Sequence, residues 1–162
     1  MRAARAAWRW DALGLRPAVA VRYIGDPQLA PAITAALRAL AEHDAPIDVQ
    51  SAAAQSARLD VDLEIDALHV PQDVVAAVGE VLFGAVTLPG TGGLLRPERL
   101  GPDGVVFQSV VVHAVMQVPG VAALHSLGFD DTPFIETGRV PAAGAHFDFA
   151  GGGVWINGQR AG

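Results

Sequence analysis

The clearest hydrophobic pattern in the chain is a strict alternation over residues 58–66. Leu59, Val61, Leu63 and Ile65 alternate with carboxylates at positions 60, 62, 64 and 66. Successive side chains of a β-strand point to opposite faces, so the pattern predicts a strand with one apolar and one acidic face. Side chains two apart stand about 7 Å apart, too far for all four carboxylates to bind one cation. We interpret the acidic face as solvated, with an arginine-bearing partner as the alternative.

The central stretch, residues 106–117, permits two interpretations. Its valines favour a strand, whereas its apolar side chains recur at the spacing of one helical face. Because burial of a face outweighs small differences in propensity, we predict a helix. Val112 and Met116 lie beside the predicted face, and we expect a second subunit to cover them; the chain's own loop 130–144 is the alternative. The predicted face comprises Phe107, Val110, Val111, Ala114, Val115 and Val118.

Periodicity and turn residues predict the remaining elements. The glycine-rich and proline-rich arm 84–104 is too irregular to be one element, and we expect another subunit to order it. Arg96 and Arg99 in this arm can act as fork-shaped donors to a partner's carboxylates. A small-residue linker is expected at 52–57, and a hairpin is expected around the three glycines at 151–153. Further strands are predicted near 18–24, 47–51, 121–129, 145–149 and 154–157, and further helices near 28–42 and 71–83.

These elements predict an α/β (α+β) fold of two small strand–helix lobes with mixed sheets, built from ferredoxin-like units and joined by the long arm. Residues 17–66 form the first lobe and residues 67–162 the C-terminal lobe. Residues 1–16 are interpreted as a lead-in segment whose arginines line one edge of a helix. A frayed terminus with packed tryptophans is the alternative for this segment.

Composition excludes several classes of protein. Of the 162 residues 51% are hydrophobic and 17% charged, which excludes a disordered chain, and the formal net charge of −6 argues against nucleic-acid binding. There is no cysteine and no lysine, so thiolate, Schiff-base and Walker A chemistry are excluded. No apolar segment reaches the about 20 residues of a membrane span, and N-terminal arginines argue against a signal peptide. We expect a cytoplasmic product without membrane insertion.

Titratable side chains give only a weak catalytic signal. His146 and Asp148 are expected on one strand face, with Asp130 and Asp131 able to approach, but no serine has the setting of a nucleophile. None of the five histidines has the spacing of a metal ligand. We expect no catalytic, cofactor or metal site and no small-molecule substrate.

Four segments together resemble the C-terminal region of baseplate J-like proteins. They are LLRPERLG (94–101), FQS (107–109), AVMQVPGV (114–121) and GAHFDFAGGGVWING (144–158). This family supplies wedge components of contractile phage tails and related injection particles, and its members are typically several times longer than this chain. The resemblance implies a structural wedge arm that works by geometry, without catalytic residues. It also implies that Trp8 and Trp10 pack on a preceding domain.

The expected function is therefore structural assembly through protein–protein contacts with other wedge subunits and further copies of the chain. The candidate partner interface comprises Trp8, Trp10, Arg96, Arg99, Val112 and Met116. The chain is expected in the cytoplasm during assembly and then in a tail or injection particle. The alternative is a ferredoxin-like domain that binds a small ligand or regulates another protein.

Overall fold

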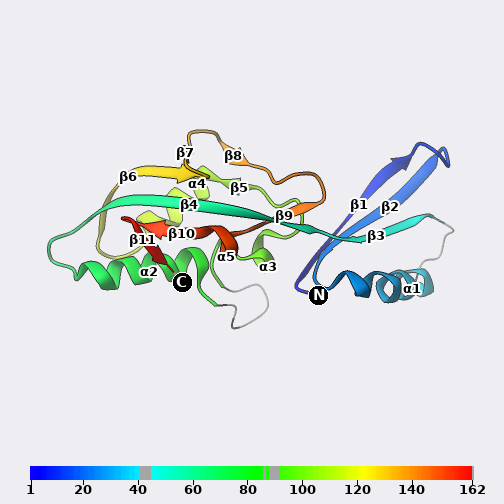
Figure 1. Cartoon of the computed structure of the whole chain (residues 1–162), viewed down its shortest axis with the longest axis horizontal. Helices are drawn as coiled ribbons and strands as arrows, with labels where there is room; N and C mark the ends of the chain where they lie inside the picture. Colours follow the sequence, from blue (N-terminus) through cyan, green and yellow to red (C-terminus); the bar gives the residue numbers. More distant parts are fainter. Residues whose placement is uncertain (41–44, 86, 88–91, 162) are drawn as a thin grey trace.

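The computed structural model describes residues 1–40, 45–85, 87 and 92–161, and it divides into two lobes along one long axis (Figure 1). A three-stranded sheet with one helix forms the small lobe, and a six-stranded sheet backed by helices forms the large lobe. Strand β3 (Ile47–Ser51) passes through Ala52 directly into β4 (Ala53–Ile65). The lobes are thus joined by one nearly continuous strand. The expected α+β class with mixed sheets is confirmed.

The small lobe is a strand–helix–strand unit with an added N-terminal strand. Strand β2 (Arg16–Ile24) pairs in parallel with β3, and the connection contains the 3-10 turn η1 (Pro27–Leu29) and helix α1 (Ala30–Leu40). Asp26 starts this connection, because its carboxylate accepts a hydrogen bond from the backbone N–H of Gln28 at 2.9 Å. The predicted strands and helix of this unit are confirmed, except that positions 41 and 42 of the predicted helix lie outside the described residues.

The interpretation of residues 1–16 as a helical lead-in is wrong. Residues Ala3–Asp11 form strand β1, which pairs antiparallel with β2 along its whole length. The arginine spacing favours a helix, but pairing with a neighbouring strand overrides such a local preference. The expected linker 52–57 is likewise mostly strand, because β4 begins at Ala53. Strand pairing therefore divides the lobes at Ala52 and not at residue 66.

The large sheet is built around β4. One edge of β4 pairs antiparallel with β6 (Val121–Phe129). Strand β6 in turn pairs antiparallel with the short strand β7 (Thr132–Pro133). The other edge pairs in parallel with two strands in succession, β9 (Ala145–Asp148) and β10 (Gly153–Ile156). Strand β10 also pairs antiparallel with β11 (Gln159–Ala161). The long strand β4 is therefore the central strand of the large sheet.

The expected hairpin between residues 145–149 and 154–157 is wrong, because β9 and β10 lie end to end along β4 and do not pair with each other. The glycines between them belong to a helical turn, α5 (Phe149–Gly152). A Cβ on Gly152 would lie 2.0 Å from the carbonyl oxygen of Ala57, and Gly153 has φ of +94°. Glycine is needed here so that this turn can press against the backbone of β4.

Two helices cover one face of the large sheet. Helix α2 (Pro71–Phe83) has the predicted bounds, and α4 (Gln108–Met116) confirms the predicted central helix over most of its length. The first two residues of that prediction instead form β5 (Val106–Phe107), which pairs with β8 (Gly138–Arg139). The short helix α3 (Pro97–Leu100) lies near β9. The core between sheet and helices includes Leu59, Val61, Leu63, Val74, Val78, Leu82, Val111, Val115, Phe129, Phe147 and Ile156.

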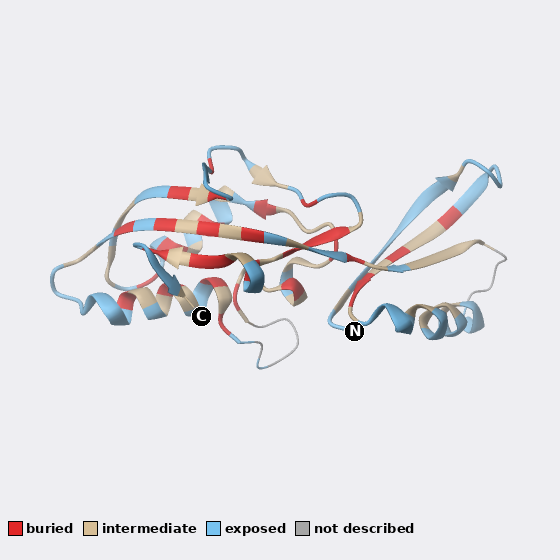
Figure 2. Cartoon of the chain, in the orientation of Figure 1, coloured by how far each residue is buried: buried red, intermediate tan, exposed pale blue. Residues whose placement is uncertain are grey.

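Burial is concentrated in the large lobe. In Figure 2 the buried segments lie mainly on β4 and the elements packed against it, whereas β1 and α1 are coloured as exposed or intermediate. No residue of α1 is buried. The small lobe buries only a few side chains, chiefly Ala18, Val21, Tyr23 and Ile24 of β2. It thus presents much more of its apolar surface to solvent than the large lobe does.

Candidate assembly surfaces

Two tryptophans of β1 lie largely in solvent. Trp8 is 70% exposed and Trp10 is 64% exposed. Their partners in the antiparallel register are Val19 and Pro17 of β2. Directly opposite residues of paired strands share a face of the sheet, so these four side chains form one apolar patch, which we call the tryptophan face.

The helix of the small lobe leaves the tryptophan face open. Helix α1 packs against β3, which lies at the opposite edge of the three-stranded sheet from β1. A tryptophan presents about 200 Å² of surface, so covering two-thirds of it corresponds to roughly 3 kcal/mol for each side chain. Exposed apolar groups gathered in one patch indicate a surface that another molecule covers.

The opposite face of the small sheet carries arginines. Arg5, Arg9, Arg16 and Arg22 follow the alternate register positions of β1 and β2, and we call them the arginine face. Asp48 of β3 binds two of them, with Oδ2 at 3.1 Å from Nη2 of Arg9 and 3.4 Å from Nη1 of Arg22. Arg5 and Arg16 are exposed. The small sheet thus has one aromatic and one basic face.

The expected two-faced character of β4 is found in the large lobe. Leu59, Val61 and Leu63 are buried against the helices, whereas Asp62 and Glu64 are exposed on the other face. Nε2 of His125 lies 3.6 Å from Oε2 of Glu64. Burial of one face against the helices and exposure of the other account for the alternation.

Arg58 is the hub of a polar cluster on the same open face. Its guanidinium lies 2.7 Å from Oδ1 of Asp60 and 3.1 Å from Oδ1 of Asp131, and it stacks 5.0 Å from the ring centre of Trp155. The hydrogen bond to Asp60 has the largest effect and raises the pKa of Arg58; burial opposes that rise, and the charges of Asp60 and Asp131 add smaller increases. The cluster links the middle of β4 to the turn after β6.

The two arginines of the arm differ in their surroundings. Nε of Arg96 donates to the carbonyl oxygens of Phe83 at 3.0 Å and Gly84 at 3.1 Å, and its guanidinium lies 4.2 Å from the ring centre of Phe83. Nε of Arg96 is therefore engaged by backbone carbonyl groups at the end of α2. Arg99 is exposed and donates to the carbonyl oxygen of Gly92 at 3.1 Å. Of the pair, Arg99 remains the more accessible to a partner.

The expectation that another subunit mainly orders the arm 84–104 is wrong for its second half. Leu95 is fully buried, and the backbone N–H groups of Leu94 and Leu95 donate to the carbonyl oxygens of Val81 and Leu82. These contacts fold the arm back onto the end of α2. Positions 86 and 88–91 of the arm lie outside the described residues.

The two residues expected beside the apolar face of α4, Val112 and Met116, differ in their burial. Val112 is half-buried and packs against the core of its own chain, whereas Met116 is 39% exposed. The helix is rotated from the predicted orientation, because Phe107 and Val110 of the predicted face are 46% and 44% exposed. The expectation that both flank residues lie off the core is therefore wrong for Val112.

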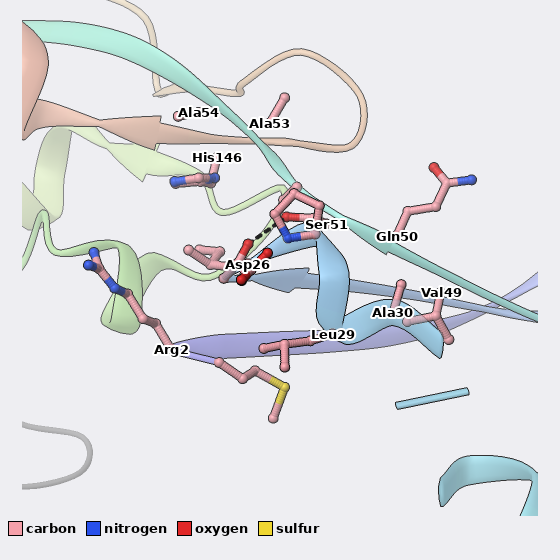
Figure 3. Close-up of a pocket in the computed structure, with 15 residues that line it drawn as sticks. Arg2, Asp26, Leu29, Ala30, Val49, Gln50, Ser51, Ala53, Ala54 and His146 are labelled. Carbon is pink, nitrogen blue, oxygen red and sulfur yellow. Dashed lines mark hydrogen bonds between the residues drawn. The ribbon is translucent and has the colours of Figure 1, made fainter. Parts of the chain in front are cut away.

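A cleft of about 950 Å³ lies where the two lobes meet (Figure 3). Its walls include Asp26, Ser51 and His146, from three different segments. Asp26 accepts from the N–H of Gln28, and Ser51 donates to the carbonyl oxygen of Gly25 at 2.9 Å. These two polar side chains therefore hold the local backbone and do not converge on a shared point in the cleft.

His146 is the buried polar residue of the cleft. It is 7% exposed, and its Nδ1 has no hydrogen-bond partner among the described residues. Asp148 instead caps α5 by accepting from the N–H of Ala150 at 3.0 Å, and Asp130 accepts from the N–H of Arg58. The weak catalytic constellation considered from the sequence is thus dispersed into separate structural roles. Within the described ranges, no group of three or more metal-binding side chains comes together.

Sequence reasoning missed the arginine face and assigned two of its residues, Arg5 and Arg9, to one edge of a helix. The signal was present, because Arg5, Ala7, Arg9 and Asp11 alternate with Ala6, Trp8 and Trp10 at the period of a strand. The cleft had no comparable signal, since its walls come from segments distant in sequence. In the part of the chain that the structure describes, no helix has both the length and the apolar character needed to cross a membrane.

Comparison of the chain with protein-family models and with curated proteins finds no match.

Proposed function

We propose that the chain is a structural assembly subunit that acts through protein–protein contacts, as a wedge component in the baseplate of a contractile phage tail or a related injection particle. The observation that carries the proposal is the open tryptophan face. Trp8 and Trp10 are 70% and 64% exposed on a sheet that no helix of the described chain covers at that point. Tryptophan is among the residues enriched at the energetic centres of protein interfaces.

The resemblance to the C-terminal region of baseplate J-like proteins supports the particular assembly. It rests on four ordered segments between residues 94 and 158, which are sequence similarities and carry no catalytic role. Under this proposal the chain is made in the cytoplasm and becomes part of a particle. Its partners are other wedge subunits and further copies of itself.

The division of the molecule into unequal lobes also favours an assembly role. The large lobe has a continuous core of its own, whereas the small lobe exposes both faces of the sheet over β1. A molecule with one lobe that buries few of its side chains is suited to insertion between neighbours, which cover the exposed surface.

The cleft between the lobes favours the alternative, a small-ligand or regulatory domain, less strongly. Ligand sites usually combine apolar walls with a few convergent polar groups. Asp26 and Ser51 are engaged with the chain's own backbone, which leaves His146 as the one buried polar group with an unpartnered atom among the described cleft residues. Equilibrium dialysis against pools of small metabolites would support the alternative if it found a stoichiometric ligand that is lost in His146→Ala.

The proposal is tested by deleting the gene in the cell that encodes the chain and examining contractile particles by electron microscopy. We expect complete particles to disappear and to return when the wild-type gene is restored. The double variant Trp8→Asp/Trp10→Asp should fail to restore them although the protein folds. Ile135→Asp, which changes an 80% exposed apolar residue elsewhere, serves as the control and should restore them. Complete particles in the deletion strain would contradict the proposal.

A further inference from the structure

The charge of the chain is divided unevenly between the lobes. Residues 1–52 contain six arginines and five carboxylates, whereas residues 53–162 contain five arginines and twelve carboxylates. The formal charges are therefore +1 and −7. Because the lobes follow one another along the long axis (Figure 1), the molecule is electrically polar from end to end.

The basic end is the arginine face of the small sheet. Asp48 is shared by Arg9 and Arg22, while Arg5 and Arg16 have no hydrogen-bond or ion-pair partner among the described residues. Arginine presents a planar fork of donors that matches a carboxylate. This face therefore offers donors that the rest of the described chain does not use.

The acidic end lies where β4 finishes and α2 begins, at the end of the molecule farthest from the small lobe (Figure 1). Asp62, Glu64 and Asp73 are exposed there, and Asp66 lies in the turn between the two elements. No arginine occurs anywhere between residues 59 and 95. Carboxylates gathered at one end of the molecule repel one another, and a basic surface placed against them reduces that repulsion.

We infer that the arginine face of one copy binds the acidic end of the next copy, so that copies associate head to tail. The inference rests on the proposed assembly function and specifies which two surfaces meet when the chain binds itself. The surfaces are different and lie at opposite ends, so each bound copy leaves one of each free. Repetition of such a contact gives a ring if the rotation closes and a filament if it does not.

Charge also opposes the symmetric alternatives. Two arginine faces or two acidic ends would bring like charges together. The exposed edge of β1 could in principle pair with a second β1, but an antiparallel pairing centred on Ala7 would place Arg5 directly opposite Arg9. Arginines along an edge strand block that kind of pairing. A second copy placed head to tail, in the same orientation along the long axis, brings the arginine face against an acidic end.

The test is sedimentation velocity of the full chain across a concentration series at about 0.05 M and about 0.5 M salt, because screening weakens contacts between exposed charges. Two variants reverse one surface each: Arg5→Glu/Arg16→Glu at the basic end, and Asp62→Arg/Glu64→Arg at the acidic end. We expect the wild-type chain to associate at low salt and to dissociate at high salt. Each variant alone should raise the dissociation constant about tenfold or more. Arg38→Glu reverses one exposed charge of the same lobe on α1, away from the arginine face, and as the control should associate like wild type.

Mixing the two variants separates a charge contact from a folding defect. The first variant carries introduced carboxylates on its arginine face, and the second carries introduced arginines at its acidic end, so the equimolar mixture should recover association in alternating order. Recovery is not expected from misfolded chains. Association of wild type that neither variant weakens, or a mixture that stays monomeric, overturns the inference while leaving assembly through the tryptophan face intact. A wild-type chain that remains monomeric at low salt also overturns it, and the particle experiment then decides the proposed function separately.

Discussion

The side-chain amide of Asn157 forms two hydrogen bonds with the backbone of Leu63. The backbone N–H of Leu63 donates to Oδ1 of Asn157 at 2.8 Å, and Nδ2 of Asn157 donates to the carbonyl oxygen of Leu63 at 3.0 Å. The amide thereby replaces the next pair of strand hydrogen bonds at the point where β10 turns away from β4. Asn157 and Gly158 have φ of 48° and 74°, as a tight two-residue hairpin turn requires.

Asn157→Ala is therefore expected to lower the free energy of unfolding by about 2–4 kcal/mol, through the lost bonds to backbone and the positive φ. Asn157→Gly removes the same bonds but tolerates the turn, so its loss should be smaller by about 1 kcal/mol. Urea denaturation of both variants measures the two contributions. Equal losses in the two variants would show that backbone conformation at this turn contributes little.

Arg96 is expected to contribute more than Arg99 to the free energy of unfolding. Arg96→Ala removes the cover over Phe83 and two bonds at the end of α2, so unfolding should become easier by about 1–2 kcal/mol. Arg96→Lys should recover only part of that loss, because an ammonium cannot reproduce the planar stacking. Arg99→Ala should change stability by less than about 0.5 kcal/mol. A larger loss for Arg99 than for Arg96 in the same denaturation series would contradict this assignment.

Val112 and Met116 provide a second matched pair, on helix α4. Val112 packs against the core, so Val112→Asp buries a charge and should destabilise the chain by about 3 kcal/mol or more. Met116→Asp lies at a partly exposed site and should leave the chain folded, with a loss of less than about 1 kcal/mol. Thermal melts followed by circular dichroism distinguish them. If both variants fold with the stability of the wild type, Val112 does not pack against the core.

The parts of the fold that could be predicted from sequence have local causes. Alternation of Leu59, Val61 and Leu63 with carboxylates reveals a strand and both of its faces. Pro71 and Gly84 mark the two ends of α2, because proline suits a first helical turn and glycine a helix end. Each of these signals lies within one element.

The parts that could not be predicted depend on contacts distant in sequence. The helical spacing of Arg2, Arg5 and Arg9 was misleading, because β1 exists through its pairing with β2. Residues 145–149 and 154–157 looked like a hairpin, whereas both segments pair with β4 about 90 residues earlier. The rotation of α4 and the position of the cleft depend in the same way on how separate elements pack.

The tryptophan face should contribute little to the stability of the isolated chain. Trp8→Asp/Trp10→Asp changes side chains that are mostly in solvent, so the free energy of unfolding is expected to fall by less than about 1 kcal/mol. Tyr23→Ala, in the same sheet, should cost about 3 kcal/mol or more because Tyr23 is fully buried and bonds to the carbonyl oxygens of Asp26 and Pro27. Denaturation followed by circular dichroism compares the two. A severe loss from the tryptophan variant would indicate that the chain itself covers these rings.

The central claim, that this chain is an assembly subunit whose tryptophan face is covered by a neighbour, is tested most directly by hydroxyl-radical footprinting of Trp8 and Trp10. The oxidation rates of both side chains are compared between the isolated chain and purified particles that contain it. Trp155, in the polar cluster of the large lobe, serves as an internal reference. The account predicts that oxidation of Trp8 and Trp10 falls about tenfold or more in the particle, because an interface core excludes water. Equal rates in the two states, or particles that lack the chain altogether, would contradict the account.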